Sequence, residues 1–307
     1  MNARAQTDPD LDPWLTLQSM MQDQGRPVLC KHPEILAPLV KRGCVIEPAG
    51  VDLYRLIEVG LPAWEDYLTA RIRRGSPRPI IKVYQQTAST QELAKAFGDR
   101  CGLAVTNHQT AGRGRLNRRW RSEAGSAVLM SLAWPKQDDV QTHDRLSMRV
   151  GLAVAKAAET LLPRQPIRIK WPNDITIGGE KLAGILIEQA DRTAIIGVGM
   201  NVHPPPPDDQ QPFRATSLAS QGGRQHRLYA LQTLVDHLLV ELDQPMPPSA
   251  PDAWRARSEL GQTQTFENQG ERITGEVLDL DPDAGLIVRR DSGEIVVLPA
   301  ATTTVLI

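Results

Sequence analysis

The chain has 307 residues, of which 41% are hydrophobic and 23% charged, and its formal net charge is −1. This balance predicts a soluble globular protein of two or three domains and excludes a general basic field for nucleic acid or anionic membranes. No apolar run approaches the roughly 20 residues that a membrane helix needs, and the polar, acidic N-terminus is no signal peptide. The scattered cysteines, Cys30, Cys44 and Cys101, predict free thiols in a reducing cytoplasm.

The first unit, residues 1–78, is predicted to be a small α/β module. After a disordered stretch over residues 1–13, the pattern predicts a helix from Pro13 to Gly25, a short helix around Leu36, strands Cys44–Glu47 and Leu53–Glu58, and a helix over Leu61–Arg74. This order resembles a winged helix, but the stretch between Gly25 and Gly43 leaves little room for the helix that enters the major groove. Residues 1–78 hold ten Lys/Arg and ten Asp/Glu. We therefore expect a degenerate or structural module and no DNA binding.

The second unit, residues 79–257, is predicted to contain a mixed sheet with packed helices. Its expected elements are strand Ile80–Tyr84, a helix from Ser89 through Phe97, strands Leu103–Asn107 and Ala127–Trp134, helix Asp144–Leu162, strands within Ile167–Ile177, Lys181–Glu188 and Ala194–Val202, helix Leu228–Leu242, and a short helix with Trp254. The S-x-x-E sequence beginning at Ser89 predicts a capping box, and Gly178-Gly179 predicts a two-residue hairpin. Short connections between the later strands favour an antiparallel meander over βαβ units.

The third unit, residues 258–307, is predicted to be a small barrel. Five short strands alternate with turns over about fifty residues. The expected strands are Thr263–Glu267, Ile273–Asp279, Leu286–Arg290, Glu294–Pro299 and Thr303–Leu306.

An arginine-rich loop between the second and third strands of the second unit is the strongest candidate for a binding site. It contains Gly112 and Gly114 alternating with Arg113 and Arg115, and further arginines follow around Trp120. Glycine lets the backbone approach a ligand closely, and the arginine fork matches carboxylate and phosphate. The sequence thus indicates a local anion clamp, with a solvated basic loop or a nucleic-acid patch as the alternatives.

Polar residues embedded in the predicted sheet indicate the same chemistry. Lys170 lies beside a tight turn that contains Asn173 and Asp174, and Lys181 opens the opposite strand, so both lysines could face one site. The alternative is an edge lysine whose charged end reaches solvent. Asn201 is expected either to cap its strand or to contact a ligand. The chain has no phosphate loop, dinucleotide fingerprint, nucleophile elbow or H-E-x-x-H motif. Such a site suits phosphoryl or adenylyl transfer, where positioning and charge neutralisation dominate.

Four motifs that occur in order connect this chain to a known family. They are G-R-G-R-x-x-R-x-W at Gly112–Trp120, K-W-P-N-D at Lys170–Asp174, K-L-A-G-I-L-I-E at Lys181–Glu188 and G-x-G-x-N at Gly197–Asn201. From about residue 80 to the C-terminus the chain resembles the biotin protein ligases. The resemblance implies an α+β fold: a mixed-sheet catalytic domain with packed helices, followed by an SH3-like barrel.

The resemblance also implies an activity, the ATP-dependent ligation of biotin to a lysine of a biotin carboxyl carrier protein, a subunit of acetyl-CoA carboxylase. In that family the biotin carboxylate attacks the α-phosphate of ATP to give biotinyl-5′-AMP and pyrophosphate. The carrier lysine then attacks the mixed anhydride and releases AMP. Biotin and ATP are the implied substrates and Mg²⁺ is expected, with its ligands left open.

Site residues follow from matching positions. The resemblance implies that biotin is bound by Ser89, Thr90, Gln91, Gln109, Arg113, Gly114, Arg115 and Lys181. It places ATP against Arg115, Arg118, Trp120, Lys170, Asn173 and Asn201. It implies catalytic roles for Arg113, Arg115 and Lys170.

The chain departs from the family pattern at one of these positions and at one further position of the arginine-rich loop. Gln91 stands where many members carry Asn, and Asn117 replaces a common Gly. The repressor role of some members is not carried over because the predicted recognition helix is shortened. Two alternative functions stay open, a biotin-responsive DNA-binding repressor and a lipoate or octanoate ligase. A homodimer is a possible assembly for any of these functions.

Overall fold

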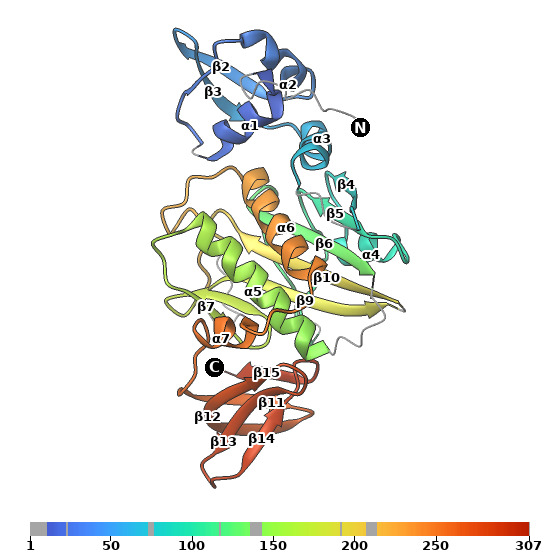
Figure 1. Cartoon of the computed structure of the whole chain (residues 1–307), viewed down its shortest axis with the longest axis vertical. Coiled ribbons are helices and arrows are strands. Elements are labelled where there is room, and N and C mark those ends of the chain that lie inside the picture. The colour runs from blue at the N-terminus through green and yellow to red at the C-terminus, as the bar shows by residue number, and fades with distance from the viewer. Residues whose placement is uncertain are drawn as a thin grey trace.

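The computed structural model describes residues 11–22, 24–72, 77–116, 118–135, 143–190, 192–206 and 214–306. Three bodies follow one another along the long axis of the molecule, an N-terminal module, a central sheet with its helices and a C-terminal sheet (Figure 1). Among the described residues, no helix is long and apolar enough to cross a membrane. The predicted disorder falls mostly on residues 1–10, which lie outside the described residues.

The N-terminal module consists of short elements around a small antiparallel sheet, in the order β1-β3-β2. Its elements are α1 (Pro13–Gln22), β1 (Val28–Leu29), the 3₁₀ helix η2 (Pro33–Leu36), α2 (Ala37–Lys41), β2 (Val45–Gly50), β3 (Leu53–Glu58) and α3 (Leu61–Arg71). The predicted hairpin is β2–β3. Between α1 and β2 the chain forms only η2, α2 and the two-residue β1, so the described part has no second full helix before the hairpin. The degenerate winged helix stays a prediction.

The central unit is a seven-stranded sheet in the order β4-β5-β6-β10-β9-β8-β7. Its strands are β4 (Ile80–Tyr84), β5 (Gly102–Thr106), β6 (Ala127–Pro135), β7 (Ile167–Lys170), β8 (Asp174–Ile177), β9 (Glu180–Ala190) and β10 (Thr193–Asn201). The pair β4–β5 is parallel and the other neighbouring pairs are antiparallel, which makes the sheet mixed. The predicted meander is therefore confirmed from β7 to β10.

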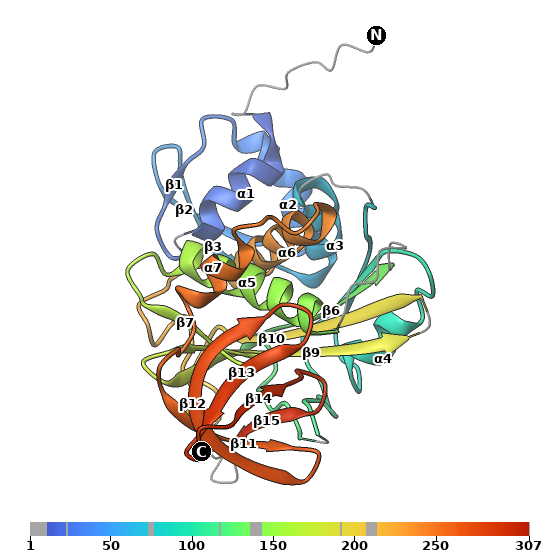
Figure 2. The same cartoon turned by 60° about the horizontal axis from the view of Figure 1, so that its bottom comes forward.

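Helices cover both faces of this sheet. Helices α5 (His143–Leu161) and α6 (Arg227–Asp243) pack on one face, and Figure 2 shows them between the sheet and the N-terminal helices. Alternate residues of β6 and β10, such as Leu132 and Ile196, join the large core on that side, whereas Ala133 and Ile195 contact α4 (Thr90–Lys95) on the other. Because α4 is short, it leaves most of its face of the sheet open for a site.

The C-terminal unit is a five-stranded antiparallel sheet in the order β14-β13-β12-β11-β15. Its strands are β11 (Thr263–Asn268), β12 (Glu271–Asp281), β13 (Gly285–Arg290), β14 (Ile295–Leu298) and β15 (Thr303–Leu306). The five predicted strands are thus found, and the arrangement fits an SH3-like domain. Helix α7 (Ala250–Arg255) precedes it and contacts β12.

Candidate active site

Glycines make a flat floor on the open face of the central sheet. Gly199 of β10 pairs with Gly184 of β9, and the indole of Trp120 lies across both. A Cβ added to Gly199 would lie 2.6 Å from Trp120 Cε2, and one added to Gly184 would lie 3.0 Å from Cζ3. The carboxamide of Gln91 covers Gly197 in the same way, at 3.0 Å. Missing side chains therefore let two large groups lie directly on the backbone.

The start of α4 forms the neutral polar end of the site. Ser89 caps the helix by accepting the Gln91 N–H at 3.3 Å. Gln109 Oε1 accepts from the Thr90 N–H at 2.7 Å and from its hydroxyl at 3.1 Å. Gln91 Nε2 donates to the Leu186 carbonyl at 3.0 Å, while its buried Oε1 has no hydrogen-bond partner. Burying an oxygen in this way is costly, so this end is suited to a ligand that donates a hydrogen bond.

The arginine-rich loop folds back on itself over the floor. Trp120 N–H donates to the Gly112 carbonyl at 3.0 Å, and Gly114 N–H donates to the Arg118 carbonyl at 2.8 Å. Gly112 has no room for a side chain, because a Cβ would lie 2.5 Å from the Trp120 carbonyl oxygen. The departure at Asn117 lies outside the described residues. The loop thus presents its arginines from a defined hairpin-like backbone.

Arg113 lies within a cluster of charges beside α4. Its guanidinium is 2.9 Å from Glu188 and 2.8 Å from Glu92, and Lys95 is 3.2 Å from Glu188 and 3.3 Å from Glu92. Two cations therefore share two carboxylates at the border of the site. Sequence reasoning did not predict this cluster, whose only visible sign was Glu188 at the end of the strand predicted over Lys181–Glu188.

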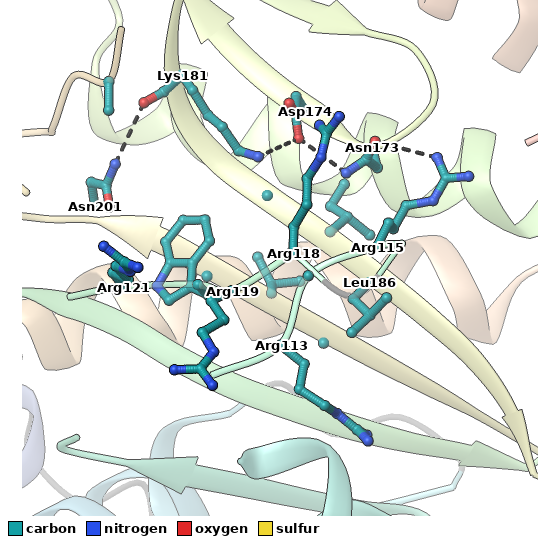
Figure 3. Close-up of a pocket in the computed structure, with 18 of the residues that line it drawn as sticks. Arg113, Arg115, Arg118, Arg119, Arg121, Asn173, Asp174, Lys181, Leu186 and Asn201 are labelled. Atoms are coloured by element: carbon teal, nitrogen blue, oxygen red, sulfur yellow. Dashed lines mark hydrogen bonds and ion pairs between the residues drawn. The ribbon is translucent and has the colours of Figure 1, made fainter. Parts of the chain in front are cut away.

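The side chain of Arg115 extends away from Arg113 and toward Asn173, as Figure 3 shows. It donates to Asn173 Oδ1 at 3.4 Å and to the carbonyl of Ala300 in the C-terminal unit. Burial lowers the pKa of its guanidinium, and the nearby Asp174 opposes that shift. A partly desolvated arginine in this position would attract an anion strongly.

A lysine–carboxylate pair borders the same end of the site. Lys181 Nζ lies 2.7 Å from Asp174 Oδ1, which also accepts from Asn173 Nδ2 at 3.1 Å. Both residues are more than four-fifths buried. Asn201 Nδ2 donates to the Thr216 carbonyl at 2.9 Å and to the Lys181 carbonyl at 3.4 Å. Asn201 therefore fastens the end of its strand, which the sequence had left undecided.

The candidate site residues line one cavity of about 930 Å³, whereas Glu92, Lys95, Glu188 and Ala300 are not part of its lining. The cavity contains every site residue named from the sequence, namely Ser89, Thr90, Gln91, Gln109, Arg113, Gly114, Arg115, Arg118, Trp120, Lys170, Asn173, Lys181 and Asn201. It also contains Thr304 and Val305 of the C-terminal unit, which sequence reasoning missed. Among the described residues, no cluster of three or more His, Cys, Asp or Glu could hold a metal ion.

Comparison with known proteins decides the family. The model of the biotin/lipoate A/B protein ligase family matches residues 81–203. A biotin–[acetyl-CoA-carboxylase] ligase of Mycobacterium tuberculosis is 34% identical over 243 residues, covering 75% of this chain and 90% of that relative. The chain belongs to the biotin protein ligase family. As a member of this family it also resembles the bifunctional ligase/repressor BirA of Bacillus subtilis, at 35% identity over 210 residues.

Coverage of these biotin protein ligase relatives differs. The match to the Bacillus subtilis protein spans 65% of this chain and 63% of that relative. Among solved structures, the biotin protein ligase from Aquifex aeolicus in complex with biotin and ATP superimposes with a TM-score of 0.66. That alignment has 24% sequence identity and covers 74% of this chain and 98% of the other. It supports the ligase fold of the described chain.

Proposed function

We propose that this protein joins biotin to a lysine of a biotin carboxyl carrier protein through biotinyl-5′-AMP. The observation that carries this proposal is the polarity of the cavity at the candidate site. Its neutral hydrogen-bonding end at Thr90, Gln91 and Gln109 is separated by the glycine floor from a cationic end at Arg115 and Lys170. A substrate with a neutral head group, an apolar stem and a carboxylate fits this order of chemistry.

Biotin would enter with its ureido ring at the α4 end. Gln91 Oε1, buried and without a partner, would accept a ring N–H, and Ser89 and Thr90 would supply further polar contacts. The apolar stem would run past the Gln91 carboxamide, which covers Gly197, toward the arginine-rich loop. Arg113 would exchange a carboxylate partner in its cluster for the biotin carboxylate, with Gly114 and Lys181 as further contacts.

ATP would occupy the cationic end of the cavity. Lys170 and Arg115 would neutralise the charge that develops at the α-phosphate as the biotin carboxylate oxygen forms its bond and pyrophosphate leaves. Asn173, Arg118, Trp120 and Asn201 complete the proposed nucleotide side. The folded loop would then exclude water from the mixed anhydride until a carrier lysine attacks it and AMP leaves.

Magnesium would arrive with ATP. Mg²⁺ is usually bound by substrate phosphates, waters and one or two carboxylates, so a cluster of protein ligands is not required. Asp174 and Glu180 supply carboxylates on the cavity wall. These residues fit an ion delivered with the nucleotide.

A panel of acids tests the substrate. Biotin, lipoate and octanoate would each be incubated with ATP, Mg²⁺ and the matching carrier domain, and the carrier mass would be measured. We expect the biotin adduct alone, because the K-W-P-N-D and G-R-G-R motifs favour biotin. Preference for lipoate or octanoate, which the wider family description allows, would overturn this choice.

We propose that the N-terminal module supports the ligase and does not read DNA. Tyr67 of α3 hydrogen-bonds Gln232 of α6, the guanidinium of Arg227 stacks on Trp64 at 4.6 Å, and the His226 N–H donates to the Met21 carbonyl at 2.8 Å. The module is thus fixed to the central unit. Saturable, biotin-dependent binding to the biotin operon at physiological salt, seen in a gel shift, would favour a repressor instead.

The remaining proposals concern location and assembly. The three cysteines are buried free thiols, which supports a reducing cytoplasm as the place of action. The carrier protein is the proposed partner, and a homodimer is a proposal that sedimentation with and without biotin and ATP would test.

A further inference from the structure

A turn of the C-terminal unit lies between the arginine-rich loop and the start of α5. The turn spans residues 299–302, between β14 and β15. The carbonyl of Ala300 accepts from Arg115, and its N–H donates to Asp144 Oδ1 at 2.5 Å. Both backbone groups of one barrel residue are therefore used, one toward the loop and the other toward the central unit.

The two ends of this connection are charged and partly or wholly shielded from water. Asp144 lies in the first turn of α5 and is only 7% exposed. Burial raises the pKa of its carboxyl, and the Ala300 N–H counteracts that shift. The carboxylate also attracts Arg115 through space. Keeping a carboxylate buried is costly unless it is hydrogen-bonded, so this contact is more than incidental packing.

A second contact at the same boundary provides a comparison. Arg145, the next residue on α5, lies 2.5 Å from Asp283 of the turn that follows β12. This pair is partly exposed, with 35% and 50% of the two side chains accessible. Asp283 joins the same two units of the chain without being a cavity residue. Breaking the Arg145–Asp283 pair therefore weakens the attachment of the barrel without touching Arg115, which makes this pair a control for the Asp144–Ala300 contact.

We infer that Asp144 is a positioning residue: through the backbone of Ala300 it sets where the barrel turn holds Arg115 at the anionic end of the cavity. This inference rests on the proposed function, and it makes the C-terminal barrel part of the structure that holds Arg115 in place. Thr304 and Val305, which follow the turn, already line the cavity. Retention of the acyl-adenylate thus depends on the Asp144–Ala300 hydrogen bond, which neither biotin nor ATP would touch.

Asp144→Ser is the main test variant, because serine suits the start of a helix but is too short to reach Ala300. Asp144→Asn keeps an oxygen acceptor of the same length, and Asp283→Ser, which shortens the side chain as Asp144→Ser does, breaks the comparison pair. Each protein would be given biotin, ATP and Mg²⁺, and the ratio of released adenylate to biotin transferred to the carrier would be measured, together with the KM for biotin and the thermal midpoint.

Asp144→Ser is expected to raise the released fraction about tenfold, the effect of losing one charge-assisted hydrogen bond. Its KM for biotin should match the parent, since the α4 end of the cavity is untouched. Asp144→Asn should stay within about twofold of the parent, and Asp283→Ser should leave the ratio unchanged. If Asp144→Ser and Asp283→Ser give the same ratio, the positioning role is wrong.

If Asp144→Ser does not fold, hydrogen exchange provides a second test that leaves Asp144 unchanged. Hydrogen exchange of the parent should slow at the 299–302 turn when biotin and ATP are added, and Arg115→Ala should abolish this protection. Equal protection in Arg115→Ala would overturn the inference. The two proposals fail differently, because a parent without biotin-dependent pyrophosphate exchange contradicts the proposed function itself.

Discussion

Replacing Gly199 by alanine should damage the nucleotide side of the site selectively. The new Cβ would lie 2.6, 2.7 and 2.9 Å from three atoms of the Trp120 indole, Cε2, Cζ2 and Cδ2. Carbon atoms in contact lie about 3.5–4.0 Å apart, so the rigid ring must retreat by about 1 Å. The Trp120 backbone is hydrogen-bonded to Gly112, so the whole loop has to shift with the ring.

Overpacking of this kind costs about 1–3 kcal/mol, which corresponds to a factor of about 5 to 150 in affinity. We therefore expect Gly199→Ala to raise the KM for ATP by at least about fivefold, while the affinity for biotin alone stays close to the parent. The assay combines isothermal titration with biotin and pyrophosphate exchange at varied ATP.

Gly197→Ala is the matched control, two residues earlier on the same strand and face. Its Cβ would meet Gln91 Nε2 at 3.0 Å, so it should weaken biotin binding and leave the KM for ATP near the parent value. The reasoning is refuted if Gly199→Ala keeps the parent KM for ATP, or if both variants weaken biotin equally.

Three further predictions follow from the contacts described above. Arg115→Ala should release free adenylate about tenfold more than the parent, because it loses an ionic hydrogen bond; parent-like retention on rapid gel filtration would exclude the loop as the clamp. Lys170→Ala should slow pyrophosphate exchange about 100-fold. The control Lys82→Ala, on β4 and outside the cavity, should leave exchange unchanged. Normal exchange in Lys170→Ala would exclude a catalytic role for Lys170. Burial lowers the pKa of His226 to about 4. In the unfolded chain its pKa is near 6.5, so between these two pH values the unfolded chain binds a proton at His226 and the native chain does not. The native state should lose about 2–3 kcal/mol as the pH falls from about 6.5 to 4. His226→Asn, which can still cap the Leu228 N–H, should lose less by denaturant titration, and equal losses would contradict the pKa argument.

Elements with a strong local pattern were predictable from the sequence. The long amphipathic helix expected over Asp144–Leu162 is found as α5, and the Gly178-Gly179 turn has the expected positive φ values of 57° and 81°. Helix α4 is shorter than predicted. The ring of Phe97 occupies the space that a side chain on Gly102 would fill, so the chain leaves the helix before Phe97 to cover the neighbouring strand.

Contacts between distant surfaces were not predictable. The motifs predicted which residues the fold brings into one cavity, but they did not predict which partners the side chains of those residues contact. Arg113 pairs with Glu188 and Arg115 with Ala300, which are 75 and 185 residues away in the chain. Such pairings depend on how the sheet, the loop and the barrel are placed relative to one another, and periodicity within a segment carries no information about that.

Biotin-dependent exchange of labelled pyrophosphate into ATP tests the central claim most directly, with lipoate and no acid as controls. The proposed chemistry predicts exchange with biotin and none with either control. No exchange in a folded sample that still binds biotin would contradict it, and the cavity would then belong to a biotin sensor without adenylation activity.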